Sequence, residues 1–184
     1  MKFATRVSLL ALAIFGLKAL AFGADEPLET ADHVDLTRYL GKWFEIARLP
    51  LIWENKCVSD VTATYTPQPD GKIGVLNTCR KSNGKVAQSK GTAKIASKHD
   101  SSNSKLKVTF FWPFSGDYWI LDLDPDYRWA LVGNPSRENL WILSRTPSLD
   151  RETIDMLLAK GASLGFNTSK IIMTKQIQPA TIAQ

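Results

Sequence analysis

Short runs of β-branched, aromatic and aliphatic residues recur along this 184-residue chain, with turn-forming residues between them. The connections between neighbouring runs are of hairpin length, which is typical of antiparallel strands joined in sequence order. Closing such a meander removes the exposed edges that an open sheet would leave. We therefore expect an all-β fold, an eight-stranded antiparallel up-and-down barrel. The expected strands are 43–49, 58–66, 73–80, 88–97, 105–112, 118–124, 127–133 and 140–145.

The part of the chain that follows these strands has a different period. Apolar residues at 149–165 recur at helical spacing on one side, which predicts a single amphipathic helix packed outside the barrel. Asp150 is placed to cap the first turn of this helix, and Gly165 is placed to end it. A short ninth strand is expected at 170–175.

The first residues have the pattern of a secretory signal peptide. Lys2 and Arg6 precede an apolar run at 7–17, which is too short to span a bilayer, and small residues at 19–21 provide a cleavage site. We predict a signal peptide at 1–21; an uncleaved membrane anchor is the alternative.

Removal of this segment changes what the net charge of the chain implies. The segment carries three basic residues and no acid, so the formal charge of +5 falls by three and gives no reason to expect nucleic-acid binding. Residues 22–184 are then expected to form one barrel domain. No cysteine occurs in residues 1–56, so we expect an exported protein, periplasmic or secreted, without a lipid anchor.

Two cysteines, Cys57 and Cys79, lie almost symmetrically about Gln68, in a turn sequence between two expected strands. A hairpin there would bring them close together, and an exported chain meets oxidising conditions. We predict a disulfide that stabilises the fold by about 3 kcal/mol on the chain-entropy model. The alternative is a free nucleophilic thiol at Cys57.

Two segments near the ends of the expected barrel carry a family resemblance. The sequence Gly-Lys-Trp-Phe-Glu-Ile-Ala-Arg at 41–48 and the sequence Trp-Ile-Leu-Ser-Arg-Thr-Pro at 141–147 resemble the signature of the lipocalins, in the branch of bacterial lipocalin and apolipoprotein D. The resemblance implies that Trp43 plugs the closed end of the barrel and that Arg145 lies across its ring. Gly41, Trp43 and Arg145 are therefore expected to be structural, and the open end is left for a ligand.

Alternation along each strand predicts which side chains face the barrel interior. The resemblance adds that pocket residues come from the positions of Tyr65, Asn77 and Trp141. The expected ligand-binding residues are Tyr65, Asn77, Trp141, Glu45, Ala63, Val75, Val108, Phe110, Trp119 and Trp129. Ala47, Leu121 and Leu131 are also expected to face inward.

Such a lining suits an apolar ligand. Each buried methylene contributes about 0.8 kcal/mol, so a long acyl chain reaches micromolar affinity without a special polar group. We predict non-enzymatic binding or transport of a fatty acid, lysophospholipid or other small apolar ligand, with no cofactor and no metal. The protein is expected to be a monomer or a weak homodimer.

Two alternatives from other functional classes remain. The first is an enzyme that uses Cys57 as nucleophile or Glu45 as an acid whose pKa is raised by burial, although we expect Arg48, Arg145 or backbone donors to bind Glu45. The second is a protein-interaction scaffold with a filled barrel. His33 and His99 are the only histidines, and their positions disfavour a histidine-based triad.

Contact with a membrane surface is suggested by two further segments. Residues 80–107 carry eight basic residues and one acid, which fits either anionic headgroups or a solvated outer face. Residues 111–116 are unusually apolar for a hairpin connection, so they are expected to contact a membrane or the pocket mouth, or else to tuck against the barrel.

Overall fold

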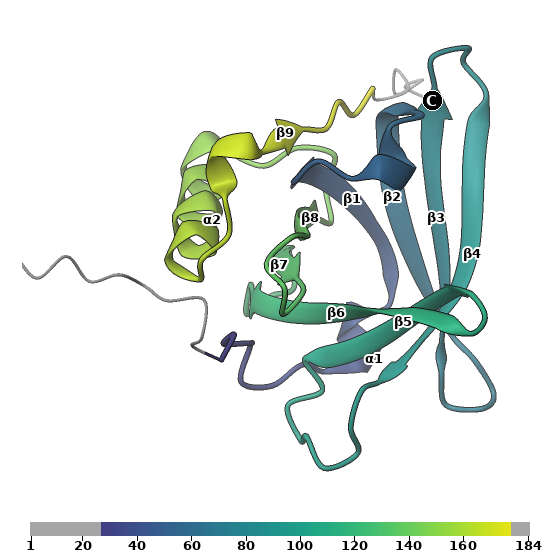
Figure 1. The fold of residues 1–184 in the computed structure, drawn as a ribbon, viewed down its shortest axis with the longest axis vertical. Helices are drawn as coiled ribbons and strands as arrows, with labels where there is room; N and C mark the ends of the chain where they lie inside the picture. The colour runs from purple at the N-terminus through teal and green to yellow at the C-terminus, as the bar shows by residue number, and fades with distance from the viewer. Residues whose placement is uncertain (1–26, 178–184) are drawn as a thin grey trace, which may run out of the picture.

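Nine strands form one antiparallel sheet in this computed structural model, which describes residues 27–177; the predicted signal peptide lies outside the described residues. The strand order runs from β2 through β8 to β1 and β9, and β1 also pairs with β2, so the first eight strands close into a barrel (Figure 1). The predicted eight-stranded barrel with a short ninth strand is thus confirmed. The strands are β1 Gly41–Arg48, β2 Cys57–Pro67, β3 Ile73–Lys81, β4 Val86–Ile95, β5 Lys105–Phe111, β6 Phe114–Leu123, β7 Trp129–Gly133, β8 Leu140–Ser144 and β9 Ile172–Met173.

The up-and-down order gives the barrel two distinct ends. The connections β1–β2, β3–β4, β5–β6 and β7–β8 lie at one end, which we call the mouth, and the other connections lie at the floor. The short helix α1, Leu36–Tyr39, lies at the floor. The β1–β2 connection at the mouth contains a single 3-10 turn, η1, Ile52–Glu54, and we call residues 49–56 the lid.

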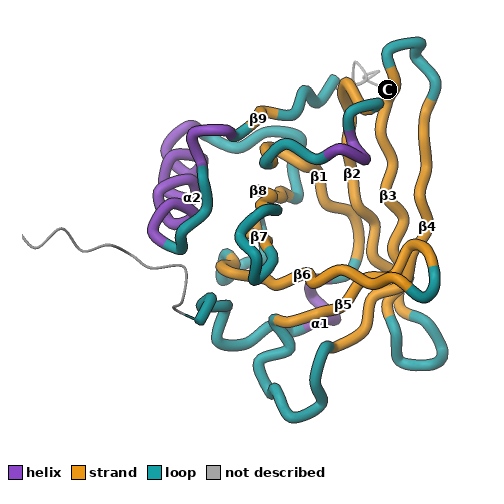
Figure 2. Tube along the Cα trace, viewed as in Figure 1, coloured by secondary structure: helices purple, strands orange, loops and turns teal. Residues whose placement is uncertain are grey.

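The helix α2, Arg151–Ser163, packs outside the barrel, as predicted, and Figure 2 shows it apart from the ring of strands. The Asp150 carboxylate caps its N-terminus by accepting a hydrogen bond from the Thr153 amide at 2.7 Å. Gly165 adopts a φ of +89° after its last turn, a conformation that glycine reaches without steric cost. A second 3-10 turn, η2, Thr168–Lys170, then leads to β9.

Two apolar clusters lie on opposite sides of the barrel wall. The inner cluster includes Val34, Tyr39, Trp43, Tyr65, Ile73, Val75, Ala93, Ile120, Tyr127, Ala130, Val132 and Leu143. The outer cluster, between the wall and α2, includes Leu28, Ile46, Ala47, Leu49, Leu121, Leu131, Leu140, Ile142, Ile154, Leu157 and Phe166. The wall on the α2 side is therefore buried on both faces.

A bulge in β1 changes the face that its last residues present. The pairing with β8 shifts between Glu45 and Ala47. Glu45 and Arg48 consequently face the interior, whereas Ile46 and Ala47 belong to the outer cluster. The prediction that Ala47 faces inward is wrong, and Arg48 takes an interior position instead. The Cα partners on β8 are Leu143 for Glu45, Ile142 for Ala47 and Trp141 for Arg48.

Strands β6 and β7 present the face opposite to the one predicted. The inner cluster takes Tyr118, Ile120, Ala130 and Val132. The outer cluster takes Trp119, Leu121, Trp129 and Leu131. The predicted inward orientation of these last four residues is therefore wrong, and Trp119 and Trp129 do not line the interior. A register shift between Ile120 and Asp122 brings Leu123 to the inner cluster.

Residues 172–177, which we call the C-terminal strap, close a seam in the wall. The β1–β2 pairing ends at Phe44, and β9 pairs with Ala47 and Arg48 at the end of β1. Farther along the strap, the Gln176 amide donates to the carbonyls of Glu45 and Val61, at 2.8 and 2.9 Å. The strap therefore joins β1 to β2 where the two strands no longer pair.

The predicted disulfide between Cys57 and Cys79 is confirmed, with a Cα–Cα distance of 5.5 Å. It joins the first residue of β2 to the last part of β3, at the mouth. Because both sulfurs are in the disulfide, the alternative of a free nucleophilic thiol at Cys57 is overturned. Among residues 27–177, no helix is long and apolar enough to cross a membrane.

Candidate ligand site inside the barrel

The floor of the barrel is sealed by the residues that the sequence indicated. The Arg145 guanidinium lies 3.9 Å from the centre of the Trp43 ring, and the Trp43 indole donates to the Tyr39 carbonyl at 2.8 Å. Arg145 also donates to the carbonyls of Lys42 and Arg38, at 3.0 and 2.7 Å. The expected contact of Arg145 with Trp43 is thus present, and it fixes α1 across the closed end.

Gly41 opens β1 with a φ of +93°, which strongly favours glycine. A β-carbon at this position would lie 3.3 Å from an Arg145 nitrogen. Gly41 therefore allows both the backbone turn and the approach of the guanidinium.

Three tyrosine hydroxyls meet above the floor. The Tyr118 hydroxyl is 2.8 Å from that of Tyr39 and accepts a hydrogen bond from that of Tyr65 at 2.9 Å. Burial raises the pKa of Tyr65 to about 12 and raises the pKa values of Tyr39 and Tyr118 well above the ordinary value. All three hydroxyls therefore remain protonated donors in neutral solution.

The wall above the tyrosines is apolar but keeps accessible surface. Several side chains that face inward are only half-buried, so they keep surface that a ligand could cover. These half-buried side chains are Ala63, Asn77, Val108, Phe110, Tyr118 and Trp141, and Val75 lies buried among them. The side-chain amide oxygen of Asn77, Oδ1, is buried and has no hydrogen-bond partner within residues 27–177. Such a group favours a ligand that can donate a hydrogen bond to it.

Ionisable groups gather at the mouth. The Arg48 Nε lies 2.8 Å from a Glu54 carboxyl oxygen and 3.5 Å from one of Glu45, and the Thr174 hydroxyl of the strap donates to Glu45. Burial raises the pKa of Glu45 to about 8 and also raises that of Glu54. The expected burial effect on Glu45 and its contact with Arg48 are confirmed, whereas Arg145 lies at the floor and does not contact Glu45.

Sequence patterns missed part of this site. Tyr39 precedes the first strand, so no alternation assigns its direction. Tyr118 was missed because its neighbour Trp119 was predicted to face inward. Glu54 lies in the lid, where no regular period exists. The β1 bulge directs Arg48 to the interior, and the carboxylate of Glu54 in the lid reaches into the barrel to pair with it.

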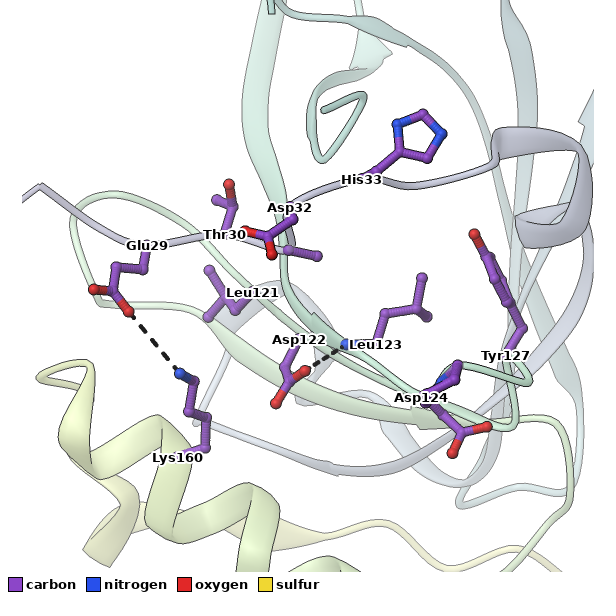
Figure 3. A pocket seen from close by; sticks show the side chains of 12 residues that line it. Glu29, Thr30, Asp32, His33, Leu121, Asp122, Leu123, Asp124, Tyr127 and Lys160 are labelled. Carbon is purple, nitrogen blue, oxygen red and sulfur yellow. Dashed lines mark hydrogen bonds and ion pairs between the residues drawn. The ribbon is translucent and has the colours of Figure 1, made fainter. Parts of the chain in front are cut away.

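A separate pocket of about 560 Å³ lies outside the barrel (Figure 3). Its acids Glu29, Asp32, Asp122 and Asp124 come from the N-terminal lead and the β6–β7 region, and Lys160 of α2 lies 4.0 Å from Glu29. Asp124 is paired with Arg128. No group of histidine, cysteine or acidic side chains suited to a metal occurs in the described part of the chain.

Large apolar side chains are exposed around the mouth. The β5–β6 hairpin ends in Phe111, Trp112 and Phe114, which are 76%, 89% and 77% exposed. Ile52 of the lid and Val86 of the β3–β4 hairpin are exposed at the same end. The hairpin tip therefore does not tuck against its own barrel.

These features define a class of protein: a β-barrel closed by a short helix at its floor, with a lid and a strap at its mouth and one external helix. A model of the lipocalin-like domain matches residues 34–176. The chain belongs to the lipocalin family, whose members bind small hydrophobic ligands.

Individual relatives agree with this assignment. The chain is 43% identical to temperature-induced lipocalin-1 of Arabidopsis thaliana over 81% of this chain and 83% of the relative. It is 41% identical to the outer membrane lipoprotein Blc of Escherichia coli over 79% of this chain and 81% of the relative. Insecticyanin of Manduca sexta superposes with a TM-score of 0.66 at 27% identity, over 84% and 86% of the two chains.

Proposed function

We propose that the barrel binds and carries a single-chain lipid, either a fatty acid or a lysophospholipid, with the acyl chain inside. The observation that carries this proposal is the set of half-buried apolar side chains that line the interior above a sealed floor. The side-chain amide oxygen of Asn77 and the tyrosine hydroxyls supply the few polar contacts that orient a ligand in such a pocket.

We also propose that binding, and not catalysis, is the activity. Cys57 is held in the disulfide, and Glu45 is already engaged by Arg48 and Thr174. Family membership supports the same assignment, because lipocalins are generally binding proteins.

The first test is native mass spectrometry of the purified protein, followed by organic extraction of anything bound and titration with a fluorescent acyl probe. A co-purifying single-chain lipid or saturable probe uptake is the expected result. An empty barrel that also excludes the probe would overturn the proposal in favour of a filled scaffold.

A matched pair of tryptophans tests where the ligand lies. Trp141→Leu removes a ring that faces inward, and we expect acyl-probe affinity to fall about 10-fold. Trp129→Leu makes the same change on the outer face of the wall and should leave probe affinity unchanged. Equal losses in both variants would contradict an interior site.

We further propose that the mouth docks on an anionic membrane surface. Phe111, Trp112 and Phe114 project from the mouth, and Lys56 and Lys85 lie exposed in connections at the same end. The wider basic stretch at 80–107 contributes less, because Arg80 and Lys107 are paired with Asp60 and Asp117.

Co-sedimentation with phosphatidylglycerol vesicles tests this surface, with phosphatidylcholine vesicles as the comparison. Trp112→Ser with Phe114→Ser should abolish binding to the anionic vesicles, whereas Val58→Ser, at another exposed mouth position, should reduce it only slightly. Undiminished binding of the double variant would exclude the hairpin tip as the docking element.

We propose, finally, that the chain is exported, since its disulfide requires an oxidising compartment and its first residues have the pattern of a signal peptide. N-terminal sequencing of the protein recovered from its host should give a start near Phe22. A protein recovered intact from Met1 would contradict cleavage.

A further inference from the structure

Arg48 is a buried cation at the mouth of the barrel, where it faces the carboxyl groups of Glu45 and Glu54. Its Cα partner on β8 is Trp141, which faces the inner cluster, so the β1 bulge directs the guanidinium to the interior. The side chain is only 9% exposed. A buried cation at the mouth needs an anionic partner, because an unpaired buried charge is strongly unfavourable.

The two carboxyl groups that pair with Arg48 are held very differently. Glu45 is part of the wall: it belongs to β1 and accepts a hydrogen bond from Thr174 of the strap. Glu54 belongs to the lid, where η1 is a single turn held by hydrogen bonds from Glu54 to Leu51 and from Asn55 to Ile52. Glu54 also interacts with the side chains of Glu45 and Trp141, but it is the partner that can leave without disrupting a strand.

The pairing of Glu54 with Arg48 is also geometrically incomplete. Its Oε2 lies 2.8 Å from the Arg48 Nε, yet this buried oxygen forms no hydrogen bond within the described residues. Arg48 donates a hydrogen bond from Nη1 to the Leu49 carbonyl at 3.1 Å. A carboxylate that is not tethered to the lid can align with the guanidinium fork in the bidentate manner that Glu54 does not achieve.

Burial further weakens the hold of Glu54. The pKa of its carboxyl is raised chiefly by burial, so keeping it ionised beside Arg48 costs free energy that is recovered when it returns to water. A ligand carboxylate is attached to a long acyl chain, and burial of that chain in the barrel contributes favourable free energy to the displacement of Glu54.

We propose that Arg48 is the binding site for the carboxylate of an acyl ligand, and that Glu54 occupies this site as an internal substitute when the barrel is empty. This inference rests on the proposed carrier function and names the headgroup that the carrier selects. Entry of a fatty acid displaces Glu54 and releases the lid, whereas an uncharged chain of the same length leaves the Arg48–Glu54 pair intact.

The test measures binding of dodecanoate and of the uncharged dodecanol to the full chain by isothermal titration calorimetry. Glu54→Gln removes the internal competitor, so dodecanoate affinity should rise about 10-fold while dodecanol affinity stays within about twofold. Arg48→Met should reduce dodecanoate affinity about 10-fold or more and spare dodecanol. Glu138→Gln, an equal charge change on the exposed β7–β8 connection at the mouth, is the matched control and should change neither affinity.

Hydrogen exchange of the lid provides a second readout that does not depend on any variant. Saturation with dodecanoate should speed amide exchange at residues 52–56, whereas dodecanol should not, because only the carboxylate expels Glu54. Faster exchange on ligand binding is the reverse of what simple burial by a ligand produces.

The outcomes separate this inference from the carrier function. If wild-type protein binds both probes but the ratio of the two affinities is unchanged in Glu54→Gln, the Arg48 site is wrong and the carrier function stands. If wild-type protein binds neither probe, both proposals fail. If Arg48→Met does not fold, the proposal is still tested by two measurements. These are the ratio of dodecanoate to dodecanol affinity in Glu54→Gln and the amide exchange of residues 52–56 in wild-type protein.

Discussion

The two arginines at opposite ends of the barrel differ in the partners that surround them. Arg145 at the floor lies over the Trp43 ring and donates to backbone carbonyls, which do not titrate. Arg48 at the mouth faces two carboxyl groups, both with raised pKa values. One cation is thus tied to permanent acceptors, and the other to acceptors that can gain a proton or move away.

This difference matches the tasks of the two ends. The floor joins α1 to β8 through contacts that any ligand would leave untouched. The mouth joins the wall, the lid and the strap through Glu45, Arg48, Glu54 and Thr174, so a change at one of these groups affects the others. The residue type alone therefore does not distinguish an arginine with a purely structural role from one whose partners can be exchanged.

The strongest test of the floor is Trp43→Ala. Trp43 is fully buried, so its truncation should lower the free energy of unfolding by about 3–5 kcal/mol, measured by urea denaturation. Trp112→Ala makes the same truncation at an 89% exposed position of the mouth and should change stability by less than about 0.5 kcal/mol. Similar losses in the two variants would mean that the floor is not the anchor of the fold.

Removal of the disulfide tests the mouth by itself. The double variant Cys57→Ser, Cys79→Ser should lose about 3 kcal/mol of stability, because the unfolded chain regains the freedom of the loop between residues separated by 22 positions. Wild-type protein unfolded under reducing conditions should show the same loss. Near-ultraviolet circular dichroism should still report a packed Trp43; loss of that signal would mean that the mouth also supports the floor.

The arginines themselves can be compared through Arg145→Met and Arg48→Met. Each should lose about 1.5–3 kcal/mol at neutral pH, since each variant removes hydrogen bonds or ion pairs of a charged group. The cost of Arg48→Met should grow as the pH rises through the range in which Glu54 and then Glu45 ionise in the wild-type protein, because Arg48 stabilises the ionised carboxylates there and the variant lacks that cation. The cost of Arg145→Met should stay constant over the same range, and parallel curves would remove the distinction between the two ends.

Glu45→Gln tests how the stability of the mouth depends on pH. The pKa of Glu45 is raised to about 8, so the folded protein retains a proton that the unfolded chain releases above about pH 4.5. Wild-type stability should therefore fall as pH rises towards 8, by at most about 1.4 kcal/mol per pH unit for this one proton. Melting temperatures of Glu45→Gln between pH 5 and 8 should show a flatter profile, whereas those of the exposed-site variant Glu138→Gln should follow wild type.

The strands and the helix were predictable because turns and polarity mark them. Each expected strand coincides with an observed one within a few residues, and Asp150 caps α2 as its position indicated. The floor was predictable from the resemblance, because its residues lie in two short contiguous segments around Trp43 and Arg145.

The facing of β6 and β7 was not predictable from polarity. Trp119 and Ile120 are neighbours that face opposite sides, and both sides are apolar because the outer cluster covers the wall beneath α2. Alternation carries no information where both faces of a strand are buried. The β1 bulge, which sends Arg48 inward, likewise depends on pairing with β8 and leaves no mark in the local sequence.

The strap carries a consequence for how the barrel is made. β1 is the first of the described strands to be synthesised, yet two of its three pairing partners, β8 and β9, are the last two. Contacts so distant along the chain form late, because the long loop between them must first be closed. A nascent chain cannot complete the wall before residues 172–177 leave the ribosome, so any machinery that meets it earlier meets an open sheet.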